Sequence, residues 1–139
     1  MNTSYIPHEL IKETLQSKAI LGNGPVEPLA SLAIKNDLPF KIIEDKKSKN
    51  MPELHVKTGD LFCCLEGVVR FVCGGTLTDK INRMNPNGSI NNNELTGKAI
   101  KNGTVHNLRR GDWLWIPPNT PHQHNSIKTA RLLIVKIPC

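Results

Sequence analysis

Two groups of residues in this 139-residue sequence combine imidazole and carboxylate side chains at short spacings. The first is Glu53-Leu54-His55, followed by Asp60 after a Thr58-Gly59 turn. Residues two apart in a strand share a face, so Glu53 and His55 point the same way, and a chain reversal at the turn lets Asp60 face them. Ionised carboxylates and a neutral imidazole on one inward face are costly to bury without a cation or hydrogen-bond donors. The group therefore predicts a site for a divalent metal ion.

The second group runs from Gly111 to His124. Gly111-Asp112 opens a short apolar strand, Pro117-Pro118 ends it, and a tight turn then leads to His122. The prolines restrict the chain before His122, which predicts a ligand that is oriented at low entropic cost. His124 lies two residues further on, shares a strand face with His122, and is predicted to contact substrate at the rim of the site.

The rest of the chain indicates which elements carry these groups. After Pro28 the sequence consists of short apolar runs separated by turn residues, with few aromatic residues (4%). Short strands at this spacing, without helices between them, are typical of an all-β sandwich, jelly roll or barrel. The runs span residues 29–34, 40–44, 53–56, 61–65, 68–73, 98–101, 105–108, 113–116 and 129–137.

Two segments depart from the strand pattern. Residues 6–19 carry apolar side chains at helical spacing, which predicts one N-terminal α-helix. We therefore expect a helical arm over residues 1–28 and a single barrel domain over residues 29–139. Residues 76–96 are rich in Asn and poor in apolar side chains, so we expect a long polar loop there, either a lid or a disordered segment.

Composition limits the classes of partner. The formal charge is +6, but the basic residues are scattered and form no helical stripe, so no nucleic-acid partner is expected. No apolar run approaches the roughly 20 residues of a membrane span. The N-terminus lacks the layout of a secretory signal. A cytoplasmic protein with no membrane partner is the expectation.

The two groups resemble the two sequence motifs of the cupin superfamily. In the first motif, Glu53, His55, Asp60 and Gly67 occupy the places of two His, a Glu and a Gly; in the second, Gly111, Pro117, Asn119 and His122 occupy those of Gly, Pro, Gly and His. The resemblance covers roughly residues 39–137, and the chain is similar to small single-domain bacterial cupins. It implies a double-stranded β-helix, or jelly-roll barrel, and a homodimer. Glu53 and Asp60 depart from the usual ligand types, and Asn119 is tolerable because Asn enters left-handed backbone conformations.

The resemblance implies a metal site in the barrel lumen formed by Glu53, His55, Asp60 and His122. Two imidazoles with one or two carboxylates suit Fe, Mn, Ni or Zn. A lumen without metal that hydrogen-bonds an organic ligand remains the alternative, and Glu53 is either a ligand or a rim residue. If the metal does not need it, Glu53 is the candidate for catalytic proton transfer.

Residue parity from Asp60 places Phe62 and Cys64 inward, as candidate substrate contacts. For Cys64 the alternative is a small core residue. The sequence thus favours a small metalloenzyme of the dioxygenase, isomerase or lyase type acting on a small polar metabolite. The alternative is a non-catalytic cupin that binds or senses a small molecule.

Overall fold

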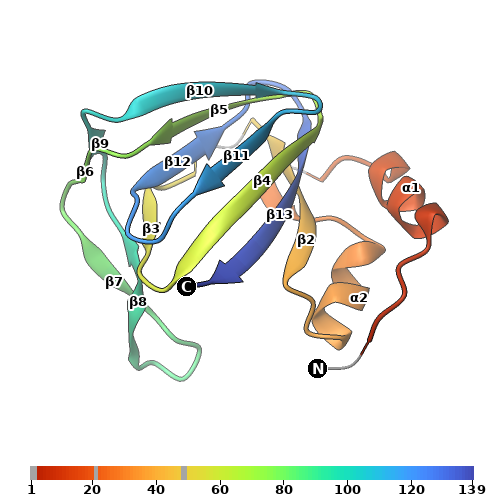
Figure 1. Cartoon of the computed structure of the whole chain (residues 1–139), viewed down its shortest axis with the longest axis horizontal. Coiled ribbons are helices and arrows are strands. Elements are labelled where there is room, and N and C mark those ends of the chain that lie inside the picture. Colours follow the sequence, from red (N-terminus) through yellow and green to blue (C-terminus); the bar gives the residue numbers. More distant parts are fainter. Residues whose placement is uncertain (1–2, 21, 48–49) are drawn as a thin grey trace.

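Antiparallel strands form most of the molecule, as the computed structural model in Figure 1 shows for residues 3–20, 22–47 and 50–139. One sheet has the strand order β1-β2-β13-β4-β11, a second has the order β10-β5-β12-β3-β8-β7, and β6 pairs with β9. This arrangement confirms the predicted all-β jelly-roll class. The strands are β1 (Gly22–Pro25), β2 (Phe40–Lys46), β3 (Glu53–His55), β4 (Thr58–Glu66), β5 (Val68–Cys73), β6 (Thr76–Leu77), β7 (Ile81–Met84), β8 (Ile90–Thr96), β9 (Ile100–Lys101), β10 (Thr104–Arg109), β11 (Trp113–Ile116), β12 (His122–Asn125) and β13 (Ala130–Pro138).

The main core lies between the two large sheets. Phe62 on β4 and Phe71 on β5 are 1% and 0% exposed and meet edge to face, with ring centroids 4.9 Å apart. Such aromatic pairs add stabilisation beyond that of their buried area. Aliphatic side chains from both sheets complete this core: Ile43, Val69, Leu108, Ile116, Leu132 and Ile134.

Two short helices lie against the five-stranded sheet near β2, on the right of Figure 1. Helix α1 (His8–Gln16) confirms the helix predicted within residues 6–19. Helix α2 (Leu29–Lys35) contradicts the strand predicted over residues 29–34. That run is short and apolar, so its pattern fits either element, and its two alanines favour a helix. A second core, centred on Val26, Leu29 and Ile42, joins the helices to the sheet.

Arg131 on β13 fixes α1 to the barrel. Its guanidinium group lies 3.0 Å from a carboxylate oxygen of Glu44 on β2, and both side chains are almost fully buried. The same group donates hydrogen bonds to the backbone carbonyls of Thr14, Leu15 and Ser17 at the end of α1. The end of the helix thus gains donors for carbonyls that lack partners within the helix.

Two further expectations were wrong. The segment 76–96, expected to be a long polar loop, contains β6, β7 and β8, and β7 pairs with β8 as a hairpin. All four residues of β7 are exposed, so hydrophobic alternation could not reveal this strand. Residues Gly22–Pro25, expected within the helical arm, form β1, which pairs with β2. In the described part of the chain, no helix has the length and apolar character needed to cross a membrane.

Candidate metal centre

Strand pairing brings the two sequence motifs together on the inner face of the six-stranded sheet. His122 on β12 pairs directly with Glu53 on β3. His55, two residues after Glu53, shares its face, as the sequence predicted. The turn before β12 is also tied to β3, because the backbone N–H of Asn119 donates to the carbonyl of His55 at 2.7 Å. Asn119 has a φ of 62°, which agrees with the expectation that it takes the place of a glycine.

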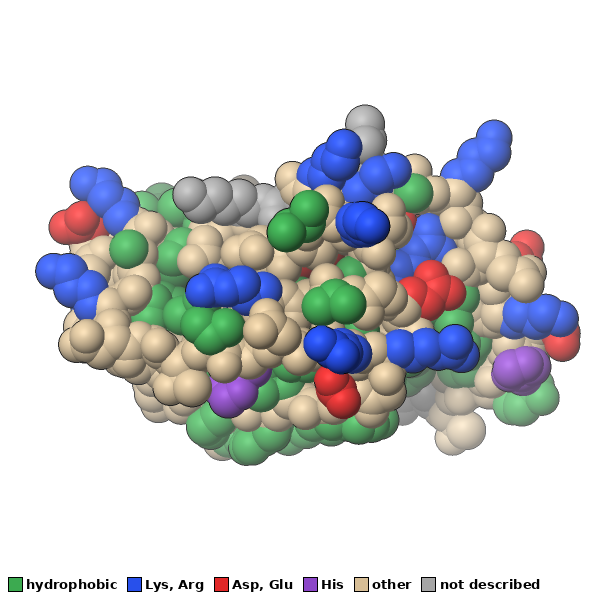
Figure 2. Space-filling view, turned by 90° about the horizontal axis from the view of Figure 1, so that it is seen from above, with side chains coloured by type: hydrophobic (Ala, Val, Ile, Leu, Met, Phe, Trp, Pro, Cys, Tyr) green, Lys and Arg blue, Asp and Glu red, His purple; other side chains and the backbone are tan. Residues whose placement is uncertain are grey.

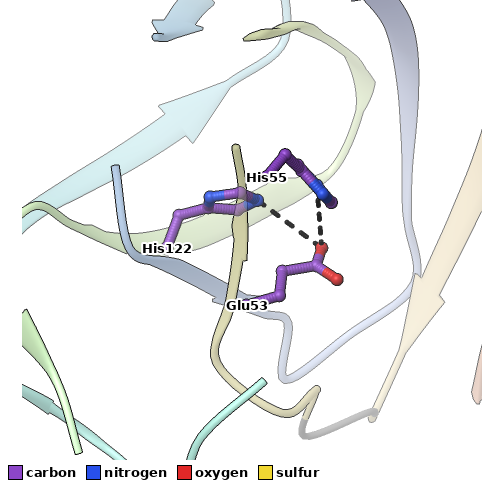
Figure 3. A group of neighbouring side chains, drawn as sticks. All are labelled: Glu53, His55 and His122. Carbon is purple, nitrogen blue, oxygen red and sulfur yellow. Dashed lines mark ion pairs between the residues drawn. The ribbon is translucent and has the colours of Figure 1, made fainter. Parts of the chain in front are cut away.

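Glu53, His55 and His122 form a compact group of donor atoms. One donor atom from each residue lies within 4.8 Å of the other two. Glu53 Oε1 lies 3.5 Å from His122 Nε2 and 3.9 Å from His55 Nε2. Figure 3 shows both imidazoles directed at this carboxylate. Two imidazoles and a carboxylate are a donor set suited to Fe(II), Mn(II), Ni(II) and Zn(II).

Hydrogen bonds fix the orientation of both imidazoles. His55 Nδ1 lies 2.6 Å from Glu94 Oε2 on the neighbouring strand β8, and His122 Nδ1 lies 3.0 Å from the carbonyl of Thr120. Each acceptor favours a proton on Nδ1, which leaves the Nε2 lone pair for a metal. His122 Nε2 is fully buried and makes no hydrogen bond to any described residue. These observations show that the residues fit a metal ion.

Asp60 lies beside the group and is held by a lysine. Its Oδ2 is 3.3 Å from His55 Nε2 and 3.5 Å from His122 Nε2, so it faces the imidazoles as predicted. Lys136 Nζ lies 2.7 Å from Asp60 Oδ1, 2.8 Å from Asp60 Oδ2 and 3.0 Å from His55 Nε2. The role of Asp60 as a ligand stays a prediction, because the ammonium group competes with a metal for its oxygens.

The charged groups of the site shift one another's protonation. Burial alone raises the pKa of Glu53, but the neighbouring His122, His55 and Arg83 outweigh it and lower this pKa to about 2. The pKa of Asp60 is also far below its ordinary value, because His122, His55 and Lys136 outweigh burial. Burial lowers the pKa of His122, yet Asp60 and Glu53 outweigh burial and raise it to about 9. Without metal, His122 is therefore a cation at neutral pH.

Metal affinity is accordingly expected to rise with pH. A metal binds the neutral imidazole, so below pH 9 each bound ion displaces the proton of His122. The apparent affinity for the metal therefore falls about tenfold for each unit by which the pH is lowered. Above pH 9 this dependence levels off. Calorimetric titration with Zn²⁺ at pH 7.5, in buffers of different ionisation enthalpy, measures the effect. About one proton released per ion is the expected result, and no release contradicts it.

A cavity of about 510 Å³ opens beside the candidate ligands. It is lined by the candidate ligands Glu53 and His55 and by the predicted substrate contacts Phe62 and His124. His122 and Asp60, each 1% exposed, are not part of this lining. Cys64 is fully buried in the main core, and burial raises the pKa of its thiol. Cys64 is not among the residues that line the cavity, so its position agrees with the alternative of a small core residue, and its contact with substrate stays a prediction.

His124 is held by a buried carboxylate. Its Nδ1 lies 2.7 Å from Asp45 Oδ2, and its ring contacts both Phe62 and Phe71, with centroid distances of 5.7 and 5.2 Å. Asn50 donates to the backbone carbonyl of His124 at 2.9 Å. The ring is therefore fixed at the cavity wall.

Sequence reasoning missed three residues of the site. Glu94 was hidden in the expected loop. Arg83, also in that segment, donates to Glu53 Oε2 at 2.7 Å. Lys136 had a usable signal, since it is one of two charges, with Arg131, within the otherwise mainly apolar run of residues 129–137. A buried charge in such a strand needs a partner, and here the partner is Asp60.

Glu94 is expected to support metal binding without being a ligand. Replacing it (Glu94→Gln) removes the charged acceptor for His55 Nδ1, so the affinity for Zn²⁺ should fall about 10- to 100-fold. Competition with a fluorescent chelator measures this change. Glu66→Gln, an exposed substitution at the end of β4, is the control. Equal affinities for the two variants contradict the role given to Glu94.

Solved structures similar to this chain support the fold. The cupin domain of Drosophila melanogaster CENP-C aligns with a TM-score of 0.51 and 13% identity, over 73% of this chain and 58% of that one. A predicted oxalate decarboxylase from Thermotoga maritima aligns with a TM-score of 0.50 and 13% identity, over 84% and 79%. YcfD, a ribosomal oxygenase from Escherichia coli, aligns with a TM-score of 0.54 and 20% identity, over 89% and 34%. Comparisons with protein-family models and with curated sequences give no match.

Proposed function

Because this chain has the cupin fold, we propose that it is a small metalloenzyme that converts a small anionic metabolite in the barrel lumen. The observation that carries the proposal is the pair of buried imidazoles, each held at Nδ1 by an oxygen, whose Nε2 atoms point at one carboxylate. Such fixed, buried donors are typical of a metal centre. A cupin fold alone does not select a reaction, so the proposal depends on the site.

Glu53, His55 and His122 would hold the ion. A bound divalent metal supplies Lewis acidity or a redox centre for dioxygenase, isomerase or lyase chemistry. The cavity beside it positions the substrate, with Phe62 and His124 in its wall. We do not retain Glu53 as the proton-transfer group, because Arg83 holds it and a carboxylate with a pKa of about 2 is a weak base.

Elemental analysis of untagged protein tests the proposal. A stoichiometric metal, or its recovery when the apoprotein is titrated with Fe(II), Mn(II), Ni(II) and Zn(II), is the expected result. Protein that takes up none of these ions supports a non-catalytic cupin that binds or senses a small molecule. A specific observation favours this second function, namely that Lys136 already supplies a cation next to Asp60 and His55.

The proposed protein is a cytoplasmic homodimer without a nucleic-acid partner. Figure 2 shows Lys and Arg side chains spread over one face among acidic, polar and apolar ones, and not gathered into a strip. On the edge strand β11, Trp113 and Trp115 are 59% and 45% exposed, and they offer a surface for a second copy. Sedimentation velocity of wild type and of Trp113→Ser tests this, and a monomeric wild type contradicts it.

A further inference from the structure

A second, mostly apolar cavity adjoins the cavity beside the candidate metal ligands, which is called the metal cavity below. It has a volume of about 670 Å³ and lies between α2 and the strands β2 and β13. Each of the two volumes falls in the range of about 300–1,000 Å³ typical of ligand pockets. The walls of the second cavity are mostly apolar and include Ala30, Ala33, Ile34, Leu38, Phe40 and Pro138.

The two cavities meet at a shared wall. Pro25, Lys41, Ile134 and Lys136 line both of them. Lys136 directs its ammonium group toward Asp60 and His55, while its side chain borders the apolar cavity. An apolar stem with a charged end is usual for a lysine at such a boundary. A ligand in the apolar cavity therefore lies next to the metal cavity.

The shared wall carries positive charge. Lys41 makes no ion pair with another residue in the described part of the chain, although it borders both cavities. The ammonium group of Lys136, by contrast, is paired with Asp60, whose two oxygens lie 2.7 and 2.8 Å away. An anionic group of a ligand at the junction would therefore pair with the ammonium group of Lys41.

We propose that the joined cavities bind a small amphipathic carboxylate, and that this is the substrate class of the site. The carboxylate lies at Lys41, and its hydrocarbon part occupies the apolar cavity beside α2. A wholly polar ligand leaves the apolar wall in water, whereas an uncharged apolar one leaves the ammonium group of Lys41 without a counter-charge. Ile34, an apolar residue of the wall that is 81% exposed, fits a surface that a ligand covers. The identification of this ligand as a substrate rests on the proposed function, whereas the binding of the ligand does not.

Calorimetry with metal-free protein tests the ligand class. The probes are butanoate, hexanoate, octanoate and 1-octanol, all below the concentrations at which they aggregate. Burial of each added methylene is expected to tighten carboxylate binding about three- to fourfold until the cavity is filled. 1-Octanol should bind at least about tenfold more weakly than octanoate, because it lacks the charge. Equal affinity for butanoate and octanoate, or for octanoate and 1-octanol, overturns the proposal.

Matched variants locate the binding site. Lys41→Met should weaken octanoate binding about tenfold and keep the dependence on chain length, whereas Lys35→Met, which removes an exposed charge from α2, should change neither. Ile34→Asp should weaken octanoate more than butanoate, and its exposed position makes misfolding no obstacle. Equal effects of Lys41→Met and Lys35→Met overturn the assignment.

Metal uptake measured on the same preparations separates the two proposals. Octanoate binding without metal uptake supports the ligand class and contradicts the metalloenzyme. Metal uptake without octanoate binding leaves the metalloenzyme standing and overturns the ligand class.

Discussion

Replacing His122 (His122→Ala) is expected to lower the affinity for Zn²⁺ or Mn²⁺ by well over about 100-fold. Loss of a residue that only supports a ligand costs about 10- to 100-fold, and the loss of a ligand must exceed this. The substitution removes one of two imidazoles whose Nε2 atoms face Glu53. It also leaves Glu53 and Asp60 with one imidazole fewer between them, so their repulsion grows in the metal-free protein.

Chelator competition and elemental analysis measure this loss. The matched control is His106→Ala, which removes an exposed histidine on β10 and should leave metal binding unchanged. Because His122 is buried, its removal can also destabilise the barrel, so Glu53→Gln serves as a second variant with a more exposed side chain. Metal affinity of folded His122→Ala and Glu53→Gln equal to wild type contradicts the assigned centre.

Replacing Arg131 (Arg131→Met) is expected to reduce the free energy of unfolding by about 3–5 kcal/mol. The substitution leaves the carboxylate of Glu44, which is 0% exposed, without its guanidinium partner. It also removes the donors to the carbonyls of Thr14 and Leu15, so α1 should separate from the sheet. Urea denaturation measures the stability, and limited proteolysis around residues 17–20 measures the release of α1.

Two further variants separate the buried charge from the lost volume. Arg110→Met removes an exposed arginine and should change the stability by less than about 0.5 kcal/mol. Arg131→Met combined with Glu44→Leu should recover part of the loss, because no unpaired charge then remains in the core. A stability of Arg131→Met close to that of Arg110→Met shows that this ion pair does not hold the helix.

Local patterns were sufficient to predict that Glu53, His55 and Asp60 face one another, whereas the barrel and the grouping of these residues with His122 came from the resemblance to the two cupin motifs. The spacing of Glu53 and His55 sets their common face, and the turn at Thr58-Gly59 returns Asp60 toward them. The prolines before His122 limit the paths that the chain can take. These local inferences use the period of a strand or the restriction of a turn, but the contact of His122 with Glu53 also requires the pairing of β12 with the distant strand β3.

The remaining parts of the site depend on long-range pairing. Glu94 reaches His55 only because β8 pairs with β3, which places residues 39 positions apart in contact. The exposed strand β7 shows no alternation of apolar and polar residues, so the sequence predicted a loop where the hairpin lies. Helix α2 was missed because seven residues of apolar character do not distinguish a helix from a strand without their packing partners.

The residues that hold the proposed metal ligands lie on a separate element, the hairpin formed by β7 and β8. The proposed metal ligands lie on β3 and β12, in the middle of the six-stranded sheet. Arg83, which holds Glu53, and Glu94, which holds His55, lie on the hairpin at the edge of that sheet. Residues 81–96 are thus a natural unit for grafting. Exchange of this hairpin between related barrels would change the electronic surroundings of a bound ion while the ligands and the core stay the same.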